Sequence, residues 1–477
     1  MKPNFSRSLN LTIYVVCLVL LFWMKPEMYE GINPNYIYTI TVIFLFCVSV
    51  HFLTGERSNW LRIDLFFILG FAIVHFQWPI MYSFSNILPE NYWDIFVDDN
   101  LINYTTWLSA VGGVSFLIGY GLFQPKSKKL PRVLNSNYNY NKLLIFTAIV
   151  FGLFLLFAGK NFLTGGVYKG EGGSAAGGGI SKYFALLFQV SLTLTTGLII
   201  YKNKEKYKGS LIKWFLGFDI LYLVIVVVYV VLFLLIGDRG GPLTLILTIL
   251  LLVGSLVRKF KFYEVFLITL LGGVVMTLIG LGRSEASGLD IFGAGSEKFE
   301  VSSGYDTTLE LANSVRTVNA TVAEVPVKHD YFYGALWVTQ LLSPIPFAQS
   351  IYMEIMDLEW YEVDSSGYIT YLVLGKYPTW GLGTSLIADI YVNFGLIGII
   401  FFMFLLGIFI KRLSIELQNP SNYKWFIMAI TVGGVSFYYS RSNYLMSFRD
   451  IIWGFLFFKL MVKTRKIGKR KRWLINE

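Results

Sequence analysis

Four arginines stand where cationic side chains are costly, beside long apolar runs or in the segment between two of them. Arg239 lies in Gly237-Asp-Arg-Gly-Gly-Pro242, between two apolar runs. A helix that begins there offers free backbone N–H groups, and the guanidinium beside it completes a site for phosphate. Anchoring at the membrane interface is the alternative for Arg239, and snorkelling to lipid headgroups is the alternative for Arg283. With Arg316 and Arg441, these residues are expected to line one cavity of positive potential that suits a phosphate-bearing ligand.

Two polar side chains lie inside a later apolar run. Asp389 and Asn393 are four residues apart, so a helix places them on one face. An acid within such a run must pair with a cation or line a wet cavity. We expect Asp389 to be functional, in orienting an arginine more than in transferring a proton. The adjacent acids Asp98 and Asp99 offer oxygen ligands for a divalent ion, although adjacency alone is weak support for a metal site.

His329 is the one histidine expected outside the apolar runs. An imidazole has an unperturbed pKa of about 6.5, which suits a general base. An ordinary surface histidine is the alternative. His51 and His75 lie in or near apolar runs and are expected to be structural.

The composition indicates that membrane helices must position these residues. Of the 477 residues, 55% are hydrophobic and only 15% are charged, whereas soluble domains carry about 25% charged residues. This balance excludes a single soluble domain, a disordered chain and a fibrous repeat. With 2 Cys and 3 His, a disulfide scaffold and a Cys/His metal cluster are excluded as well.

A helix that crosses a membrane needs about 20 mostly apolar residues. The sequence therefore predicts an all-α polytopic membrane protein with about twelve spans by that criterion, forming a single transmembrane domain over residues 1–477. The predicted spans are 8–24, 35–54, 61–82, 101–123, 142–159, 181–201, 213–236, 242–257, 262–282, 384–410, 423–440 and 446–463.

Alternate connections between these runs are basic, which predicts that they face the cytoplasm and that both termini do too. The net charge of +10 is then an orientation signal, and nucleic acid is not expected as a partner. Residues 463–477 are predicted to be a basic cytoplasmic tail that contacts anionic lipid. The basic connections carry Lys126, Lys128, Lys129, Arg132, Lys202, Lys204, Lys206, Lys208, Arg258, Lys259, Lys261, Lys411 and Arg412.

Two connections on the predicted outer face differ from the others. Residues 283–383 form a large outer loop between spans nine and ten, and its apolar stretch 336–347 is too short and too rich in proline to cross. That stretch is expected to lie in the interface or to re-enter. Half of residues 164–179 are glycine, which predicts a mobile tether or lid, with a phosphate cradle as the alternative.

These features together resemble the Wzy-type polymerases of O-antigen and capsule repeat units. The resemblance covers the layout of many spans with one large late outer loop. It is closer over roughly 237–283 and 381–450, which contain the Arg239-Gly240 turn and Gly383-Thr-Ser-Leu-Ile-Ala-Asp-Ile-Tyr-Val-Asn-Phe-Gly-Leu-Ile-Gly398. Asp389 stands where the family pattern more often has Glu, whose side chain is one methylene longer.

The resemblance implies a lipid-linked glycosyltransferase of the multi-span (GT-C-like) class in the bacterial cytoplasmic membrane. It would join undecaprenyl-pyrophosphate-linked oligosaccharides on the outer face, with no metal and no cofactor. Arg239, Arg283, Arg316 and Arg441 would offset the pyrophosphate charge, with Asn393 and Tyr391 also contacting the substrate. His329 or Glu285 would take the acceptor proton, and Asp389 completes the candidate catalytic residues.

Other functions share parts of this pattern. An O-antigen ligase would share the fold, the donor and the arginine cavity, and would differ only in its acceptor. A flippase or other transporter would be expected to place a cationic cavity between two pseudo-symmetric bundles, and no internal repeat stands out in the sequence. A chain-length regulator protein is a further candidate partner.

Overall fold

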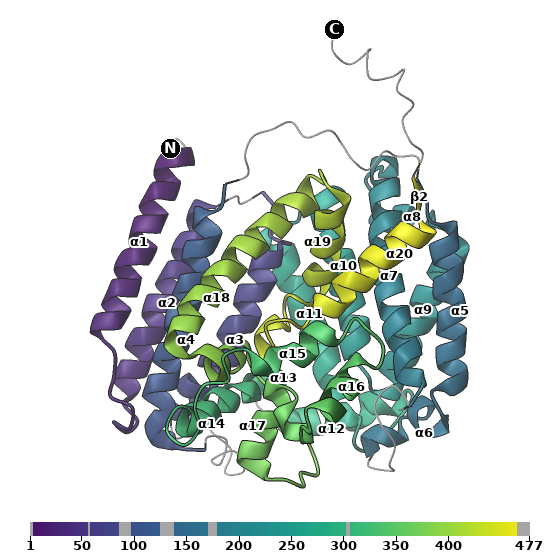
Figure 1. The fold of residues 1–477 in the computed structure, drawn as a ribbon. Helices are drawn as coiled ribbons and strands as arrows, with labels where there is room; N and C mark the ends of the chain where they lie inside the picture. The colour runs from purple at the N-terminus through teal and green to yellow at the C-terminus, as the bar shows by residue number, and fades with distance from the viewer. Residues whose placement is uncertain are drawn as a thin grey trace.

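The computed structural model describes residues 3–55, 58–84, 97–124, 138–169, 179–301 and 306–464. These residues are overwhelmingly helical (Figure 1), as predicted, and their only strands are a short antiparallel pair. In that pair, β1 (Tyr138–Asn139) lies against β2 (Lys463–Thr464). The basic residues at 126–132, most of the glycine-rich connection and most of the predicted tail lie outside the described residues.

Each predicted span contains a helix, because each supplies a long apolar run. The seventh run is divided in two, since the Asp219 carboxylate accepts a hydrogen bond from Leu221 N at 3.0 Å and starts a new helix. The helices are α1 (Pro3–Trp23), α2 (Pro34–Thr54), α3 (Ile63–Ser83), α4 (Ile102–Leu122), α5 (Asn141–Phe157), α7 (Ser181–Asn203), α8 (Leu211–Leu216), α9 (Ile220–Ile236), α10 (Gly240–Leu256), α11 (Phe262–Gly282), α18 (Leu386–Gln418), α19 (Tyr423–Val435) and α20 (Phe448–Met461).

In the described part of the chain, 6 helices are long and apolar enough to cross a membrane by themselves. They are α2, α3, α7, α11, α18 and α4 with its preceding turn η2 (Asp99–Leu101). Shorter apolar helices occur within α1 and in α5, α9, α10 and α19. The chain is therefore a helical, multi-pass membrane protein, and the number of twelve spans stays a prediction.

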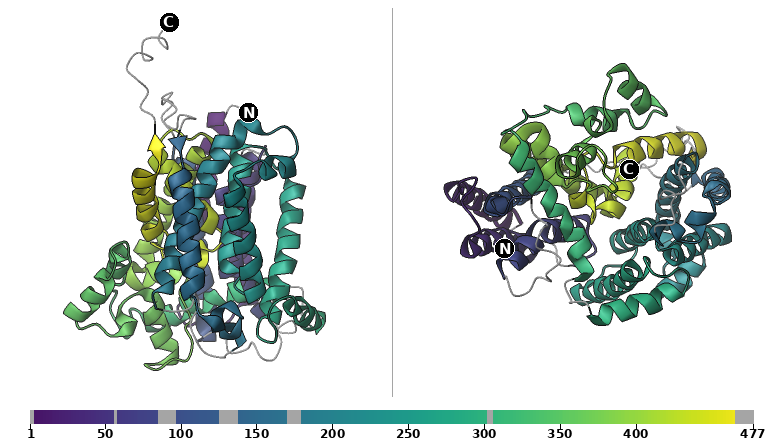
Figure 2. Two further views of the ribbon diagram at one scale, coloured as in Figure 1. Left: turned by 90° about the vertical axis from the view of Figure 1, so that its right-hand side faces the viewer. Right: turned by 90° about the horizontal axis from the view of Figure 1, so that it is seen from below.

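The central contact of the bundle joins α4 to α18. A Cβ atom at Gly119 would overlap the Phe404 carbonyl, and one at Gly407 would overlap the Phe116 carbonyl. Small residues thus let the two backbones touch, as helix pairs in membranes commonly do. From below, the N-terminal helices and the helices of 141–282 lie on opposite sides, with the C-terminal helices between them (Figure 2). Accordingly, α18 packs on α4, α19 packs on α10 and α20 packs on α7.

Residues 283–383, which we call the 283–383 segment, lie at the end of the bundle opposite to the start of α1 and to β2 (Figure 1). The segment is largely helical, and its helix α15 covers part of the apolar stretch 336–347 with only 8 residues. Its elements are α12 (Asp290–Val301), α13 (Asp306–Ala312), η6 (Asn313–Val315), α14 (Arg316–Glu324), α15 (Ala335–Leu342), α16 (Ala348–Ile355), η7 (Trp360–Glu362) and α17 (Ser365–Leu374). The remaining short elements are α6 (Lys160–Leu163), η3 (Gly166–Lys169), η5 (Lys204–Lys206) and η8 (Tyr439–Arg441).

Helix α18 is broken at Gly395, which attaches the segment to the bundle. Gly395 has φ 62° and ψ −157°, so the carbonyls before it lose their helical partners. The segment replaces those partners: Phe332 N donates to Val392 O at 3.1 Å and Tyr333 N donates to Asn393 O at 2.8 Å. Val392 and Asn393 are fully buried, so protein shields the non-helical backbone at this break.

Candidate anion-binding site

Three of the four predicted arginines converge on one carboxylate, that of Glu310 in α13. Arg239 Nη2 donates to Glu310 Oε2. Arg283 Nη2 lies 3.5 Å from Glu310 Oε1, and Arg441 Nη1 lies 3.9 Å from the same oxygen. We call Arg239, Arg283, Arg441 and Glu310 the arginine cluster. It joins four regions of the chain: the α9–α10 turn, the end of α11, α13 and η8.

Local sequence fixes the position of Arg239. Gly237 ends α9 in the left-handed conformation, with φ 92°, which favours glycine. The chain then reverses, and Gly240 N donates to Asp238 Oδ1 at 3.2 Å as α10 begins. Arg239 Nη1 donates to Met276 O at 2.7 Å, and a Cβ atom at Gly280 would overlap the guanidinium. The Gly280 position therefore has to be small for Arg239 to lie across α11.

Arg283 is held by an aromatic ring and by the same turn. Its guanidinium carbon lies 5.2 Å from the centroid of the Tyr168 ring, a cation–π distance. Burial raises the pKa of the Tyr168 hydroxyl to about 12, and the nearby Asp238 adds to that shift. Burial also raises the pKa of Asp238, and this effect outweighs the hydrogen bonds from N–H groups of the turn, which lower that pKa. Arg283 is therefore oriented by its contacts, which distinguishes it from an arginine that only reaches lipid headgroups.

Arg316, the fourth predicted arginine, lies beside the cluster and is not one of the three arginines that face Glu310. Its guanidinium carbon is 5.0 Å from the centroid of the Trp380 ring. Burial lowers the pKa of Arg316, and the positive charge of Arg441 lowers it further, so the two arginines are within electrostatic range. Within the described part of the chain, Arg316 Nε is buried and has no hydrogen-bond partner.

The cluster carries more positive than negative charge. Burial opposes the ionisation of Glu310, but Arg239 and Arg283 outweigh it and hold the pKa of this carboxyl below its ordinary value. Glu310 is therefore ionised at neutral pH, and three guanidinium groups face one carboxylate. An excess of two positive charges remains, which suits a ligand that carries two negative charges, and guanidinium forks match phosphate oxygens.

Asp389 connects the 283–383 segment to the bundle. Its carboxylate is fully buried and accepts hydrogen bonds from Trp337 Nε1 at 3.0 Å, from Tyr444 N at 2.7 Å and from Ser365 Oγ. These donors belong to α15, to the connection that follows Arg441, and to α17. Asp389 therefore contacts the connection that follows Arg441, and the orienting role expected from the sequence stays a prediction.

Asn393 and Tyr391 are also buried in this region. Asn393 Oδ1 accepts from Gly334 N at 3.1 Å, and Asn393 Nδ2 donates to Asp389 O at 2.9 Å. The Tyr391 ring lies 5.8 Å from that of Tyr331, and the side chain is 2% exposed. Both residues support the break in α18, and contact with the substrate stays a prediction for them.

The two candidate bases have different surroundings. His329 is exposed, and its ring centroid is 6.1 Å from that of Tyr368. Glu285 follows Arg283 by two residues and forms an ion pair with Lys298 at 2.9 Å, which lowers the pKa of Glu285. Glu285 is thus ion-paired and close to Arg283 in sequence, whereas His329 is exposed beside Tyr368, and a role as base stays a prediction for both.

The acid pair after the third span takes part in hydrogen bonds. Asp98 Oδ1 accepts from Asn100 N at 2.9 Å, and Asp99 Oδ2 accepts from Tyr82 OH at 2.6 Å. Asn319 holds the same turn: Asp98 N donates to Asn319 Oδ1 at 3.0 Å, and Asn319 Nδ2 donates to Asp98 O at 2.8 Å. Among the described residues, no three His, Cys, Asp or Glu side chains are grouped as a metal site would require.

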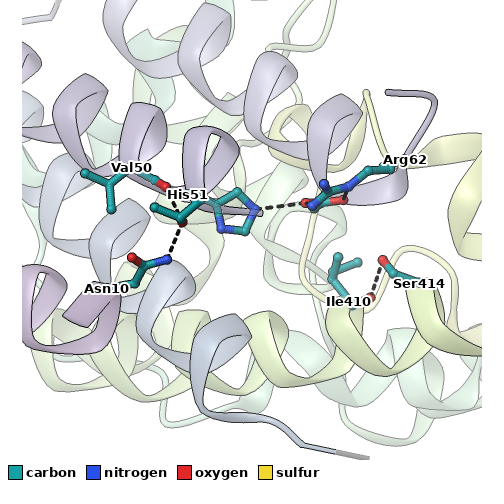
Figure 3. Close-up of polar contacts among 8 residues, drawn as sticks. Asn10, Val50, His51, Arg62, Ile410 and Ser414 are labelled. Carbon is teal, nitrogen blue, oxygen red and sulfur yellow. Dashed lines mark hydrogen bonds and ion pairs between the residues drawn. The ribbon is translucent and has the colours of Figure 1, made fainter. Parts of the chain in front are cut away.

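The histidines expected to be structural are buried between helices. His51 Nε2 lies 2.9 Å from Asp64 Oδ2, and Arg62 Nε donates to Asp64 Oδ1 at 3.0 Å (Figure 3). This network ties α2 to the start of α3. His75 lies on α3, where its Nδ1 is 3.4 Å from Ser109 Oγ of α4.

Sequence reasoning missed Glu310, Tyr168 and Trp380. Nothing in the local sequence distinguishes Glu310 from the other acids of the segment, and Tyr168 stands in a glycine-rich connection. An acidic partner could have been expected from the arginines themselves, since several arginines brought together in a membrane protein require an anion to offset their charge.

Fold and contacts together define the chain as a multi-pass membrane protein with a cluster of arginines at the end of the bundle that bears the 283–383 segment. Residues 181–469, more than half of the chain, match the family model described as O-antigen polysaccharide polymerase Wzy. The chain belongs to this family, whose members polymerise polysaccharide repeat units, so the resemblance noted from the sequence is confirmed. Comparisons with curated proteins and with solved structures found no match.

Proposed function

We propose that this polymerase joins oligosaccharide repeat units carried on undecaprenyl pyrophosphate, on the outer face of the bacterial cytoplasmic membrane. The observation that carries the proposal is the convergence of Arg239, Arg283 and Arg441, with an excess of positive charge. A lipid pyrophosphate carries negative charge at the membrane surface. The site lies at the end of the bundle that the basic connections predict to be outside.

In the proposed reaction, a hydroxyl oxygen of the incoming unit bonds to the anomeric carbon of the growing chain. The bond from that carbon to the phosphate oxygen breaks, and undecaprenyl pyrophosphate leaves with the electron pair. Negative charge therefore develops on the pyrophosphate in the transition state. Preorganised arginines stabilise such charge without the reorganisation that water would need, and we propose that they do so without a metal.

The acceptor hydroxyl also loses a proton, for which Glu285 and His329 are the two candidates. Glu285 is the nearer of the two to Arg283 in sequence, but its ion pair with Lys298 lowers its pKa and weakens it as a base. Separate Glu285→Gln and His329→Ala variants decide between them. The variant of the true base should lose chain extension at neutral pH, while the other should keep it.

The experiment that tests the proposed function is the size distribution of the surface glycan in a strain that lacks this gene. We expect the ladder to collapse to a single repeat unit on its carrier, and the wild-type gene to restore it. A full-length polymer that stays on its lipid would indicate a ligase instead. No exported glycan at all would indicate a flippase.

A further inference from the structure

A cavity of about 480 Å³ opens in the 283–383 segment, between α16, η7, α17 and residues 378–381. Its volume is in the range of small-molecule sites. Residues of the arginine cluster are not among its lining. Two indole rings and several polar groups line it: Trp360, Trp380, Asp364, Ser366, Thr370 and Thr379.

The lining has the chemistry of a sugar site. A pyranose ring presents apolar C–H faces and a rim of hydroxyl groups. The C–H faces pack on the electron-rich faces of aromatic rings, while the rim needs hydroxyl and carboxylate partners. Trp360 and Trp380 are 36% and 50% exposed, so both rings are accessible to a ligand. Asp364 disfavours an anionic ligand in this cavity and can accept hydrogen bonds from sugar hydroxyls.

The walls of the cavity are fixed by internal hydrogen bonds. Asp364 Oδ1 accepts from Gly367 N at 2.8 Å and so begins α17. Trp360 Nε1 donates to Lys376 O at 3.2 Å. Thr370 Oγ1 accepts from Leu382 N at 3.1 Å, which ties the rim to α17. A ligand therefore meets a lining that is already ordered, which reduces the entropy lost on binding.

Trp380 joins the cavity to Arg316, which lies beside the arginine cluster. The Trp380 ring contacts the Arg316 guanidinium, and Arg316 is within electrostatic range of Arg441. One indole thus belongs both to the cavity and to the edge of the cationic site. A ligand with sugar rings next to a pyrophosphate matches this arrangement, in which a cavity with aromatic walls lies next to a cationic site.

We propose that this cavity binds a sugar ring of the repeat unit while the arginine cluster holds the pyrophosphate. The inference rests on the proposed function and adds a subsite to it. Two sources can supply the ring: the acceptor unit, or the sugars of the donor next to its pyrophosphate.

The first test measures binding to the full-length protein in lipid nanodiscs. The probes are the oligosaccharide released from the lipid carrier that accumulates in the deletion strain, and inorganic pyrophosphate. Trp360→Ala and Trp380→Ala should each weaken oligosaccharide binding at least about tenfold, the loss of one stacking contact of roughly 1.4 kcal/mol. Trp360→Phe should keep part of the affinity. Unchanged pyrophosphate binding by Trp360→Ala shows that the protein is folded.

Tyr377→Ala is the matched control, because this aromatic side chain is 88% exposed and does not line the cavity. It should bind the oligosaccharide as the wild type does. Wild-type oligosaccharide affinity in both tryptophan-to-alanine variants would overturn the proposal.

Kinetics then identify the source of the ring, with polymer on its lipid as donor and the free oligosaccharide as acceptor. A higher KM for the oligosaccharide in Trp360→Ala assigns the cavity to the acceptor, and a higher KM for the polymer assigns it to the donor. The two proposals fail differently. If the protein extends no chains but the tryptophan variants lose oligosaccharide binding, the sugar site stands and the polymerase reaction is rejected. If the protein extends chains and the variants bind the oligosaccharide as the wild type does, the polymerase reaction stands and the sugar site is rejected.

Discussion

At the scale of single residues, Arg239 has the most direct part in the cationic site, because it contacts both Glu310 and the backbone of α11. Arg239→Ala should slow chain extension by roughly 10²- to 10³-fold, the usual loss for one preorganised donor. Arg239→Lys should restore it only partly, since an ammonium group lacks the bidentate fork. The length of the glycan ladder at wild-type expression measures both effects.

Lys328→Ala is the control for Arg239. Lys328 is also a cation of this end of the bundle, but its side chain is 64% exposed and pairs with Glu324. It should leave the ladder unchanged. Wild-type ladders from Arg239→Ala and Arg441→Ala would remove the basis for an arginine site.

The Glu310 carboxylate contacts the same guanidinium groups that are proposed to bind phosphate, so it should compete with phosphate for them. Each guanidinium about 4 Å from a carboxylate contributes about 1 kcal/mol in water-like surroundings. Glu310→Gln should therefore raise the affinity for inorganic pyrophosphate about fivefold or more, and the gain should shrink at high salt. Calorimetric titration at two salt concentrations measures both. A weaker affinity instead would mean that Glu310 serves to hold the arginines in position.

The arginines could be predicted from the sequence and Glu310 could not. A cation beside an apolar run is a local signal, because the cost of its charge near lipid depends on its own surroundings. The partner of that cation is not local: Arg239 and Glu310 are 71 residues apart and meet through the packing of α10, α11 and α13. The roles of His329, Glu285, Asn393 and Tyr391 stay predictions, because each role depends on contact with a substrate.

At the scale of elements, the break in α18 should be sensitive to a single methyl group. Gly395→Ala places a Cβ atom 2.7 Å from the Tyr331 ring, at a φ of 62° and a ψ of −157° that are essentially restricted to glycine and cost other residues roughly 1–3 kcal/mol. We expect a lower midpoint of thermal unfolding and loss of the hydrogen bonds to Phe332 and Tyr333. Activity should fall with them, because the break attaches the segment to the bundle.

Gly272→Ala provides the comparison for Gly395→Ala. Gly272 lies in α11 with open space around it, so alanine there should be neutral or slightly stabilising. Equal thermal stability of the two variants would contradict the role given to the break.

The positions of the helices follow from the sequence, whereas their interruptions do not. Runs of apolar residues predict where a helix lies, because lipid tolerates little else. The break at Gly395 and the division of the seventh run depend on which groups satisfy the freed carbonyls or N–H groups. At Gly395 those groups are Phe332 and Tyr333, some 60 residues earlier in the sequence.

At the scale of the whole molecule, the predicted orientation can be tested with introduced cysteines. Both native cysteines, Cys17 and Cys47, are buried, so the background should be low. A membrane-impermeant maleimide should label Tyr377→Cys in cells whose outer surface is accessible. It should label Lys206→Cys, an exposed residue at the other end of the bundle, only after the cells are permeabilised. Labelling of Lys206→Cys in intact cells would reverse the orientation.

The anchoring of the 283–383 segment also has a consequence for biogenesis. Asp389 and Asn393 hold the segment through hydrogen bonds, and the Tyr444 ring stacks on Trp337 of the segment; all three follow it in the chain. A ribosome therefore delivers the segment before the residues that fix it, and Arg441 follows Asp389 and Asn393 but precedes Tyr444. A nascent or truncated chain that ends before η8 lacks one of the arginines of the site. The complete cluster can assemble only once η8 has been synthesised, so products truncated before η8 should bind inorganic pyrophosphate more weakly than the whole chain does.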